Sequence, residues 1–184
     1  MSAVLTARLD YDAYLAWEEL QPGKNEFFEG QVFAMVGPQR VHGEIVRNLT
    51  VALQAHLQET PCRSFSTDMK VRAAAANAVF YPDLFVTCDP RDLVTELVFE
   101  HPRLVIEVLS DSTAAYDRGL KFDAYRQLPS LTEYVLIAPD RKSVEVFRRN
   151  VEDLFVLHDY TGHAAVEFRS VDASIATAAV FENA

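Results

Sequence analysis

Two carboxylates stand inside strand-like runs of apolar residues, where an uncompensated charge is costly. Asp83 lies in YPDLFV and Glu107 in LVIEVL, and each is the only charged residue well inside its run. Burying a lone carboxylate in such a place costs several kcal/mol even after the protein relaxes. A divalent cation would compensate both charges at once, and Mg²⁺ or Mn²⁺ prefers a few carboxylate oxygens while it keeps water ligands. We therefore predict that Asp83 and Glu107 together bind Mg²⁺ or Mn²⁺.

The spacing of the two carboxylates suits neighbouring strands. Positions 83 and 107 leave room for two strands and a connection between them. If the strands pair, both side chains point to one face of the sheet at the same level. Pro82 cannot donate a ladder hydrogen bond and belongs at a strand edge or start. Asp83 is therefore expected near the beginning of its strand, at the rim of the sheet.

The segment that follows Glu107 carries a lysine at helical spacing. Asp117, Lys121 and Tyr125 are four residues apart in turn, so in a regular helix they share one face. Lys121 is then positioned to stand over the strand of Glu107 and to orient a water or stabilise a developing phosphate charge. The alternative is an exposed ion pair between Asp117 and Lys121, worth a few tenths of a kcal/mol. The spacing alone leaves both interpretations open.

Hydrophobic periodicity predicts a single α/β domain over residues 1–184. Helices are expected over 8–20, 40–59 and 112–128, and a hairpin over 25–36 that turns at Glu29-Gly30. Runs typical of strands cover 62–75, 79–88, 103–110, 132–138 and 143–148. A further hairpin is expected from 153–158 and 164–168, around Gly162.

Length and composition are those of an ordinary globular domain. The chain has 184 residues, of which 49% are hydrophobic and 24% charged. Cys62 and Cys88 are too few for a disulfide framework and are predicted to be two ordinary buried thiols. The first 20 residues lack the pattern of a signal peptide, and no apolar run approaches the roughly 18 residues of a membrane span. A cytoplasmic protein is expected.

The net charge of −10 counts against a protein that binds nucleic acid without specificity. Such proteins derive their affinity from lysines and arginines that neutralise phosphates. The charge does not exclude a nuclease, because carboxylates gathered around a metal add negative charge and the metal itself faces the phosphate.

Several motifs follow one another in an order that is more specific than any one of them. FFEGQVFAM precedes a helix entered at His42, and YPDLFVTCD, LVIEVLSDST, YDRGLKFDAYRQL and LTEYVLI follow. With them the chain resembles the Uma2 (DUF820) family of the PD-(D/E)XK nuclease superfamily. The resemblance implies a restriction-endonuclease-like α/β fold, with a central mixed β-sheet flanked by helices. It also implies a metal-dependent DNA endonuclease in which Asp83 and Glu107 are the metal-binding carboxylates.

The chain departs from the superfamily pattern at one position. The motif lysine is expected two residues after Glu107, where Leu109 stands. The resemblance implies that Lys121 takes its place as catalytic lysine.

The resemblance also points to residues around these three. Glu29 is a candidate third carboxylate for the metal, with a solvated hairpin turn as the alternative. His42 is a candidate contact for a phosphate or a metal-bound water, and Tyr125 a candidate substrate contact. For His42 the alternative is a residue at a helix N-terminus satisfied by the backbone.

Three functions are compatible with these residues. The first is a Mg²⁺- or Mn²⁺-dependent endonuclease whose partner is DNA. The second is a non-catalytic metal-binding or regulatory module that kept the nuclease fold, which the net acidity and Leu109 favour. The third is a hydrolase of small molecules at the same metal site. A homodimer is also expected, with the C-terminal SIATAAVF as either a core strand or an interface.

Overall fold

The structure is a computed structural model that describes residues 8–35, 37, 39–66 and 68–184. Three expectations fall partly outside these ranges. They concern the first seven residues, where no signal peptide is expected, and Val36 and Thr67, at the end of the expected hairpin and within a strand-like run.

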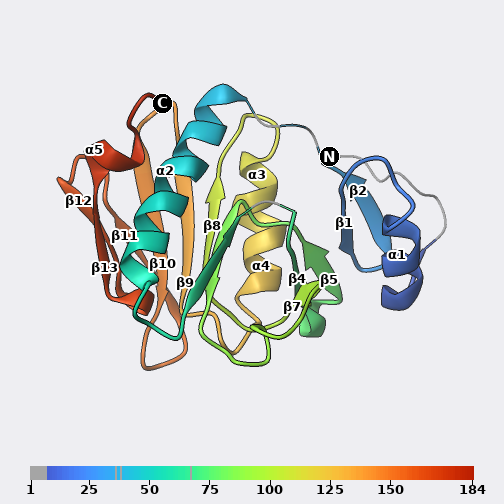
Figure 1. Ribbon diagram of the computed structural model, residues 1–184. Coiled ribbons are helices and arrows are strands. Elements are labelled where there is room, and N and C mark those ends of the chain that lie inside the picture. The colour runs from blue at the N-terminus through green and yellow to red at the C-terminus, as the bar shows by residue number, and fades with distance from the viewer. Residues whose placement is uncertain (1–7, 36, 38, 67) are drawn as a thin grey trace.

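A central sheet of six strands forms the middle of the molecule (Figure 1). Its order is β11-β10-β9-β8-β6-β3. The strands are β3 (Arg63–Ser66), β6 (Leu84–Thr87), β8 (Pro102–Val108), β9 (Glu133–Ala138), β10 (Ser143–Arg149) and β11 (Phe155–Asp159). β8 and β9 are parallel and the other neighbours antiparallel, so the sheet is mixed, as predicted.

Two smaller sheets accompany it. The five-stranded one has the order β2-β1-β5-β4-β7, and the two-stranded one pairs β12 with β13. Their strands are β1 (Asn25–Phe28), β2 (Gln31–Ala34), β4 (Lys70–Ala73), β5 (Ala78–Phe80), β7 (Val98–Phe99), β12 (Ala165–Phe168) and β13 (Ala173–Ala176). The hairpin expected around Gly162 is wrong, because β11 pairs with β10 and β12 with β13. Val166 and Phe168 of β12 are fully buried in the same hydrophobic core as the apolar residues of α2. This packing places β12 outside the central sheet.

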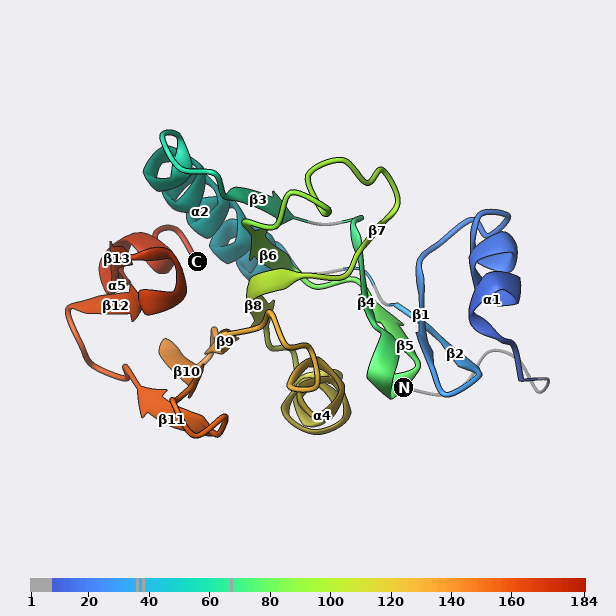
Figure 2. The ribbon, with the colours of Figure 1, turned by 90° about the horizontal axis from the view of Figure 1, so that it is seen from below.

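The helices are α1 (Tyr11–Glu18), α2 (Arg40–Leu57), α3 (Ala114–Tyr116), α4 (Phe122–Tyr125) and α5 (Thr177–Val180). α2 and α4 cover the two faces of the central sheet, whereas α1 packs on the β1–β2 hairpin. Figure 2 shows α2 on one side of β6, β8 and β9 and α4 on the other. The apolar stripe of α2, formed by Ile45, Leu49 and Leu53, is fully buried against the sheet. In the described part of the chain, no helix has the length and apolarity that a membrane crossing requires.

The apolar run over 79–88 is two strands, although the sequence pattern predicts one. β5 belongs to the five-stranded sheet and β6 to the central sheet, and the chain passes between them at Tyr81, Pro82 and Asp83. Pro82 has no N–H for a ladder, which suits a break at this point. Leu84 of β6 pairs with Ile106 of β8, and the same register extended by one residue sets Asp83 opposite Glu107.

The prediction of two buried thiols is wrong, because Cys62 and Cys88 form a disulfide. Arg63 of β3 pairs with Thr87 of β6, so the next position of this antiparallel register brings the two cysteines together. The C-terminal run SIATAAVF is a core element, since Ile175, Val180 and Phe181 are buried. This run is therefore not an interface candidate, and self-association stays a prediction.

Candidate active site

A cleft of about 1110 Å³ opens where Asp83, just before β6, and Glu107 of β8 meet the helical segment 114–121. The first half of α2 and the turn between β9 and β10 form its other walls. Three residues predicted from the sequence line it together, namely Asp83, Glu107 and Lys121, and His42 lies beside them. The structure therefore gathers residues that are up to 79 positions apart in the sequence, from 42 to 121.

Asp83 is held by two hydrogen bonds to one oxygen. Its Oδ2 accepts the backbone N–H of Val108 at 2.7 Å and lies 3.0 Å from Nε2 of His42. Because a carboxylate only accepts, Nε2 of His42 carries the hydrogen in this pair. The backbone N–H of Asp83 points to Oε2 of Glu107 at 3.4 Å. The two carboxylates are thus neighbours, as the expected strand pairing requires.

Lys121 is buried among three carboxylates. Its Nζ lies 2.9 Å from Oε1 of Glu26, 3.2 Å from Oε1 of Glu107 and 3.4 Å from Oδ1 of Asp117. Lys121 is only 5% exposed and Asp117 only 2%. The alternative of an exposed Asp117–Lys121 ion pair is therefore wrong, and Lys121 reaches Glu107 from the helix.

A π-helical turn over Asp117–Lys121 joins α3 to α4. Such turns are rare in proteins, but many of those that occur lie at functional sites. The hydroxyl of Tyr134, from the strand beside β8, donates to the carbonyl oxygen of Asp117 at 2.9 Å. This turn directs both Asp117 and Lys121 toward Glu107.

Tyr125 does not line the cleft, contrary to its expected role as a substrate contact. It is fully buried and its ring packs against those of Phe80 and Tyr134, with centroids 5.2 and 5.6 Å away. The physical reason is the core beneath the helix, which encloses the turn C-terminal to Lys121.

Glu29 is not brought to the site either. It occupies the β1–β2 turn with φ 47° and is exposed, followed by Gly30 at φ 86°. Positive φ at both central residues is what a tight type I′ hairpin turn requires. Glu26, on the same hairpin, reaches Lys121 instead. The sequence signal for Glu26 is present in the same motif, since a carboxylate beside the apolar pair FF of a strand is costly.

Burial and mutual repulsion shift the protonation of this group. Burial raises the pKa of Glu107 well above its usual range; Lys121 opposes the shift, while Asp117 and Asp83 add to it. Burial likewise raises the pKa of Glu26 and of Asp117, and Lys121 again opposes it. Burial alone would lower the pKa of Lys121, but Glu107, Glu26 and Asp117 raise it well above its usual range. Burial thus disfavours the charged form of each carboxyl, whereas the charges of the three carboxylates favour the ammonium form of Lys121.

This surplus of buried negative charge fits a bound divalent cation. Oε2 of Glu26 is buried and has no hydrogen-bond partner among the residues that the structure describes. Asp83 and Glu107 offer the hard oxygen donors that Mg²⁺ and Mn²⁺ prefer. Within the described ranges, no three side chains of His, Cys, Asp or Glu are arranged to hold a metal by themselves. Asp83 and Glu107 are therefore the two carboxylates whose chemistry fits such a cation.

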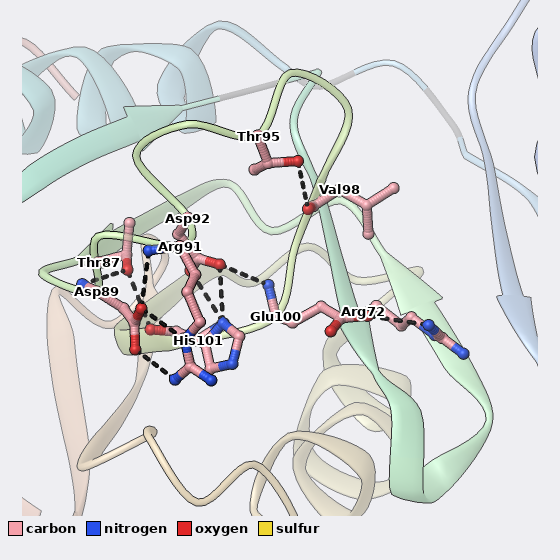
Figure 3. Close-up of polar contacts among 9 residues, drawn as sticks. All are labelled: Arg72, Thr87, Asp89, Arg91, Asp92, Thr95, Val98, Glu100 and His101. Atoms are coloured by element: carbon pink, nitrogen blue, oxygen red, sulfur yellow. Dashed lines mark hydrogen bonds and ion pairs between the residues drawn. The ribbon is translucent and has the colours of Figure 1, made fainter.

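A second polar cluster lies in the loop between β6 and β7 and serves the backbone (Figure 3). Asp92 is buried, at 3% exposure, and accepts the backbone N–H groups of Glu100 and His101 at 3.0 and 2.9 Å. It also faces Nδ1 of His101 at 3.0 Å. The motif CDPRD is typical of a solvated turn, and that prediction is wrong for Asp92, because its buried carboxylate satisfies the backbone of this loop. It fits Asp89, whose side chain accepts the N–H of Arg91 at 2.9 Å.

Comparison with known proteins assigns the class of this domain. A crystal structure described as "a putative nuclease belonging to DUF820", from Anabaena variabilis, matches with a TM-score of 0.75. The match covers 94% of this chain and 97% of that one at 18% identity, so it shows a shared fold. The mixed sheet with helices on both faces is therefore the α/β fold of that protein.

The family follows from the sequence comparison. The model of the Uma2 family, described as "Putative restriction endonuclease", matches residues 11–176. The chain belongs to this family. Two uncharacterised Synechocystis proteins are also similar: slr1290 is 34% identical over 95% of this chain and 92% of its own length. The other, sll1609, is 30% identical over 91% of this chain and 97% of its own length.

Proposed function

We propose that this protein is a Mg²⁺- or Mn²⁺-dependent endonuclease that hydrolyses phosphodiester bonds of DNA. The observation that carries the proposal is the ammonium of Lys121, which lies 3.2 Å from Glu107 although Leu109 stands at the motif position. Membership of the Uma2 family and the acidic pair Asp83–Glu107 support it.

The side chains of the cleft would divide the work as follows. Asp83 and Glu107 would hold the cation, which when bound polarises the phosphate and lowers the pKa of a water. Lys121 would neutralise the charge that develops on the phosphate in the transition state. His42 would fix the orientation of Asp83 through its Nε2–H at 3.0 Å. The buried core around Leu109 would keep bulk water from the inner side of Glu107.

Asp83→Asn tests the proposal directly. The substitution keeps the size of the side chain and an oxygen for the Val108 N–H, and it removes the charge that would bind the cation. We expect the rate of cleavage to fall by about 10³-fold or more, which corresponds to about 4 kcal/mol. The measurement is cleavage of labelled single- and double-stranded DNA and RNA in Mg²⁺, Mn²⁺ or EDTA. Asp123→Asn, an aspartate with 65% of its side chain exposed outside the cleft, is the control.

Three outcomes would count against the endonuclease. Full metal-dependent cleavage by Asp83→Asn would show that the activity arises elsewhere. If the purified wild type binds Mn²⁺ but cuts no form of DNA or RNA, the non-catalytic module that kept the fold becomes the better account. Hydrolysis of small phosphodiesters alone would favour the third candidate.

Two exposed arginines on facing walls of the cleft are expected to contact the DNA backbone. Arg47 of α2 and Arg141 of the β9–β10 turn have side chains 60% and 62% exposed and both line the cleft. Each has an acidic neighbour, Glu44 at 2.7 Å and Asp140 at 4.0 Å, which a phosphate would have to displace. They would supply local positive charge to a DNA backbone in a protein whose net charge is −10.

Charge reversal at these positions should weaken binding and reduce its salt dependence. For Arg47→Glu and Arg141→Glu, the slope of log K against log salt should fall by about 1 for each phosphate that the variant no longer neutralises. The measurement is fluorescence anisotropy of a labelled oligonucleotide in the Asp83→Asn background, so that no cleavage intervenes. Arg169→Glu is the matched control, because that side chain is 67% exposed, is paired with Glu167 and lies outside the cleft. Equal slopes for all three variants would remove the arginines from the proposed interface.

A further inference from the structure

Glu26 is a buried carboxylate that the proposed chemistry does not use. It lies on β1, is 1% exposed and does not line the cleft. Its Oε1 makes the shortest of the three ion pairs of Lys121, at 2.9 Å. The same oxygen accepts the backbone N–H of Tyr81 at 3.2 Å. A carboxylate so deeply buried persists only if its partners compensate the cost.

Lys121 needs such a partner because it lies on a helical segment and not on the strand that carries Glu107. A lysine two residues after Glu107 would be held on the same face of the same strand. That position is Leu109, which is 6% exposed in the apolar core and donates its N–H to Ile137 at 2.8 Å. Lys121 reaches the site instead from a helix, on a flexible four-carbon stem with a freely rotating ammonium. Only side chains can fix the position of that ammonium.

The three available carboxylates are not equivalent. Glu107 would be shared with the cation, so its hold on Lys121 weakens when the cation binds. Asp117 lies on the same helical segment as Lys121 and is the most distant of the three, at 3.4 Å. Glu26 comes from a separate sheet and has no other charged partner among the described residues. It is therefore the carboxylate that fixes Lys121 independently of the helix and of the cation.

Glu26 is also connected to the segment that positions Asp83. Tyr81 donates its N–H to Glu26 and stands two residues before Asp83. The hydroxyl of Tyr81 donates to Glu18 of α1 at 2.8 Å, and Glu18 accepts the N–H of Asn25, next to Glu26, at 2.8 Å. Figure 1 shows α1 and the β1–β2 hairpin side by side at one end of the molecule. Glu26 thus links Lys121 to the segment that leads to Asp83, while Glu18 braces Tyr81 and Asn25 without contacting Lys121.

We propose that Glu26 is a positioning residue whose carboxylate holds the ammonium of Lys121 beside Glu107 while Glu107 binds the cation. A lysine at position 109 would be positioned beside Glu107 by the strand that both residues share. Glu26 provides this positioning for Lys121. The kinetic consequence rests on the proposed endonuclease function, whereas the consequence for Lys121 itself does not.

Glu26→Gln tests the inference, since it removes the charge and nearly keeps the volume. Two readouts are needed. In the absence of metal and DNA, the rate at which acetic anhydride modifies Lys121, followed by mass spectrometry, should rise about tenfold, because the ammonium loses its shortest ion pair. In cleavage assays kcat should fall about 10- to 100-fold, as when a supporting partner of a metal site is lost, with KM unchanged.

Glu18→Gln is the matched control. Glu18 is equally part of the N-terminal unit and is 6% exposed, but it does not contact Lys121. It should lower the Tm without changing the modification of Lys121. Glu26→Asp, which keeps the charge but shortens the reach, should expose Lys121 to an intermediate degree. If Glu26→Gln fails to fold, this second variant decides the question.

Wild-type modification of Lys121 in both Glu26 variants would overturn the inference, and so would a kcat equal to that of the wild type. Absence of cleavage by the wild type would contradict the proposed endonuclease and leave the modification assay as the deciding measurement for Glu26. The two failures are therefore distinguishable.

Discussion

Glu107→Gln is expected to abolish metal-dependent cleavage and, at the same time, to raise the thermal stability of the metal-free protein. The loss of cleavage should reach about 10³-fold or more, because one of the two carboxylates proposed to hold the cation becomes neutral. The gain in stability has a different origin. Glutamine resembles the protonated acid, and burial together with Asp117 and Asp83 already disfavours the ionised form of Glu107.

The pH dependence gives the sign of this effect. The pKa of Glu107 is raised in the folded protein, so the folded protein binds more protons than the unfolded chain between the ordinary carboxyl pKa and the raised one. The free energy of unfolding of the metal-free wild type should therefore fall as the pH rises through that window. Glu107→Gln should flatten this dependence and raise the Tm most at the alkaline end, by about 2–4 °C for each kcal/mol gained.

Calorimetry between pH 5 and 9, with EDTA and then with Mn²⁺, measures both effects. Mn²⁺ should stabilise the wild type but not Glu107→Gln. Glu145→Gln, whose side chain is 18% exposed and pairs with Arg118, is the control for removal of a carboxylate outside the cluster. A variant that is less stable than the wild type at pH 8 would show that Glu107 is ionised and well compensated by Lys121 alone.

Lys121→Met should have the opposite effect on stability. Three buried carboxylates within 3.4 Å of Nζ would lose their only close cation among the described residues. Removing one partner of a buried ion pair costs about 3–5 kcal/mol, so the Tm should fall by roughly 10 °C. The loss should shrink at low pH, where Glu26, Glu107 and Asp117 become protonated and need no counter-charge. Cleavage should be lost at any pH.

Lys142→Met serves as the control, because this lysine is exposed in the β9–β10 turn and pairs with no described carboxylate. Thermal unfolding in EDTA at pH 5 and pH 8 is sufficient for the comparison. If Lys121→Met and Lys142→Met melt within about 2 °C of each other at pH 8, a difference worth no more than about 1 kcal/mol, the buried carboxylates do not depend on Lys121.

The residues that can be predicted from the sequence are those that violate a local rule. Asp83 and Glu107 interrupt apolar runs, and the burial penalty alone marks them as members of a site. Helical spacing after Glu107 points to Lys121, and the structure brings its ammonium to Glu107 at 3.2 Å. The mixed central sheet and the long helix α2 are equally predictable from their hydrophobic periodicity.

The remainder depends on contacts that no local pattern encodes. Glu26 reaches Lys121 across 95 positions, and only the packing of the five-stranded sheet against the helix brings them together. The disulfide follows from the register of β3 against β6, which composition does not reveal. A place for Tyr125 in the cleft requires a regular α-helix, whereas a π-turn precedes this residue and the core encloses it.

The site draws its residues from elements that are far apart in the sequence. Glu26 comes from the β1–β2 hairpin, Asp83 from the passage between two sheets, Glu107 from the central sheet and Lys121 from a helix. Contacts between residues far apart in the sequence form late in folding, because the entropy cost of closing the intervening loop comes before the contact stabilises the protein. A chain still emerging from the ribosome through residue 120 has no Lys121 and leaves its acidic residues without their buried cation. The cluster of Glu26, Glu107 and Lys121 can therefore assemble only once the chain has been synthesised past residue 121.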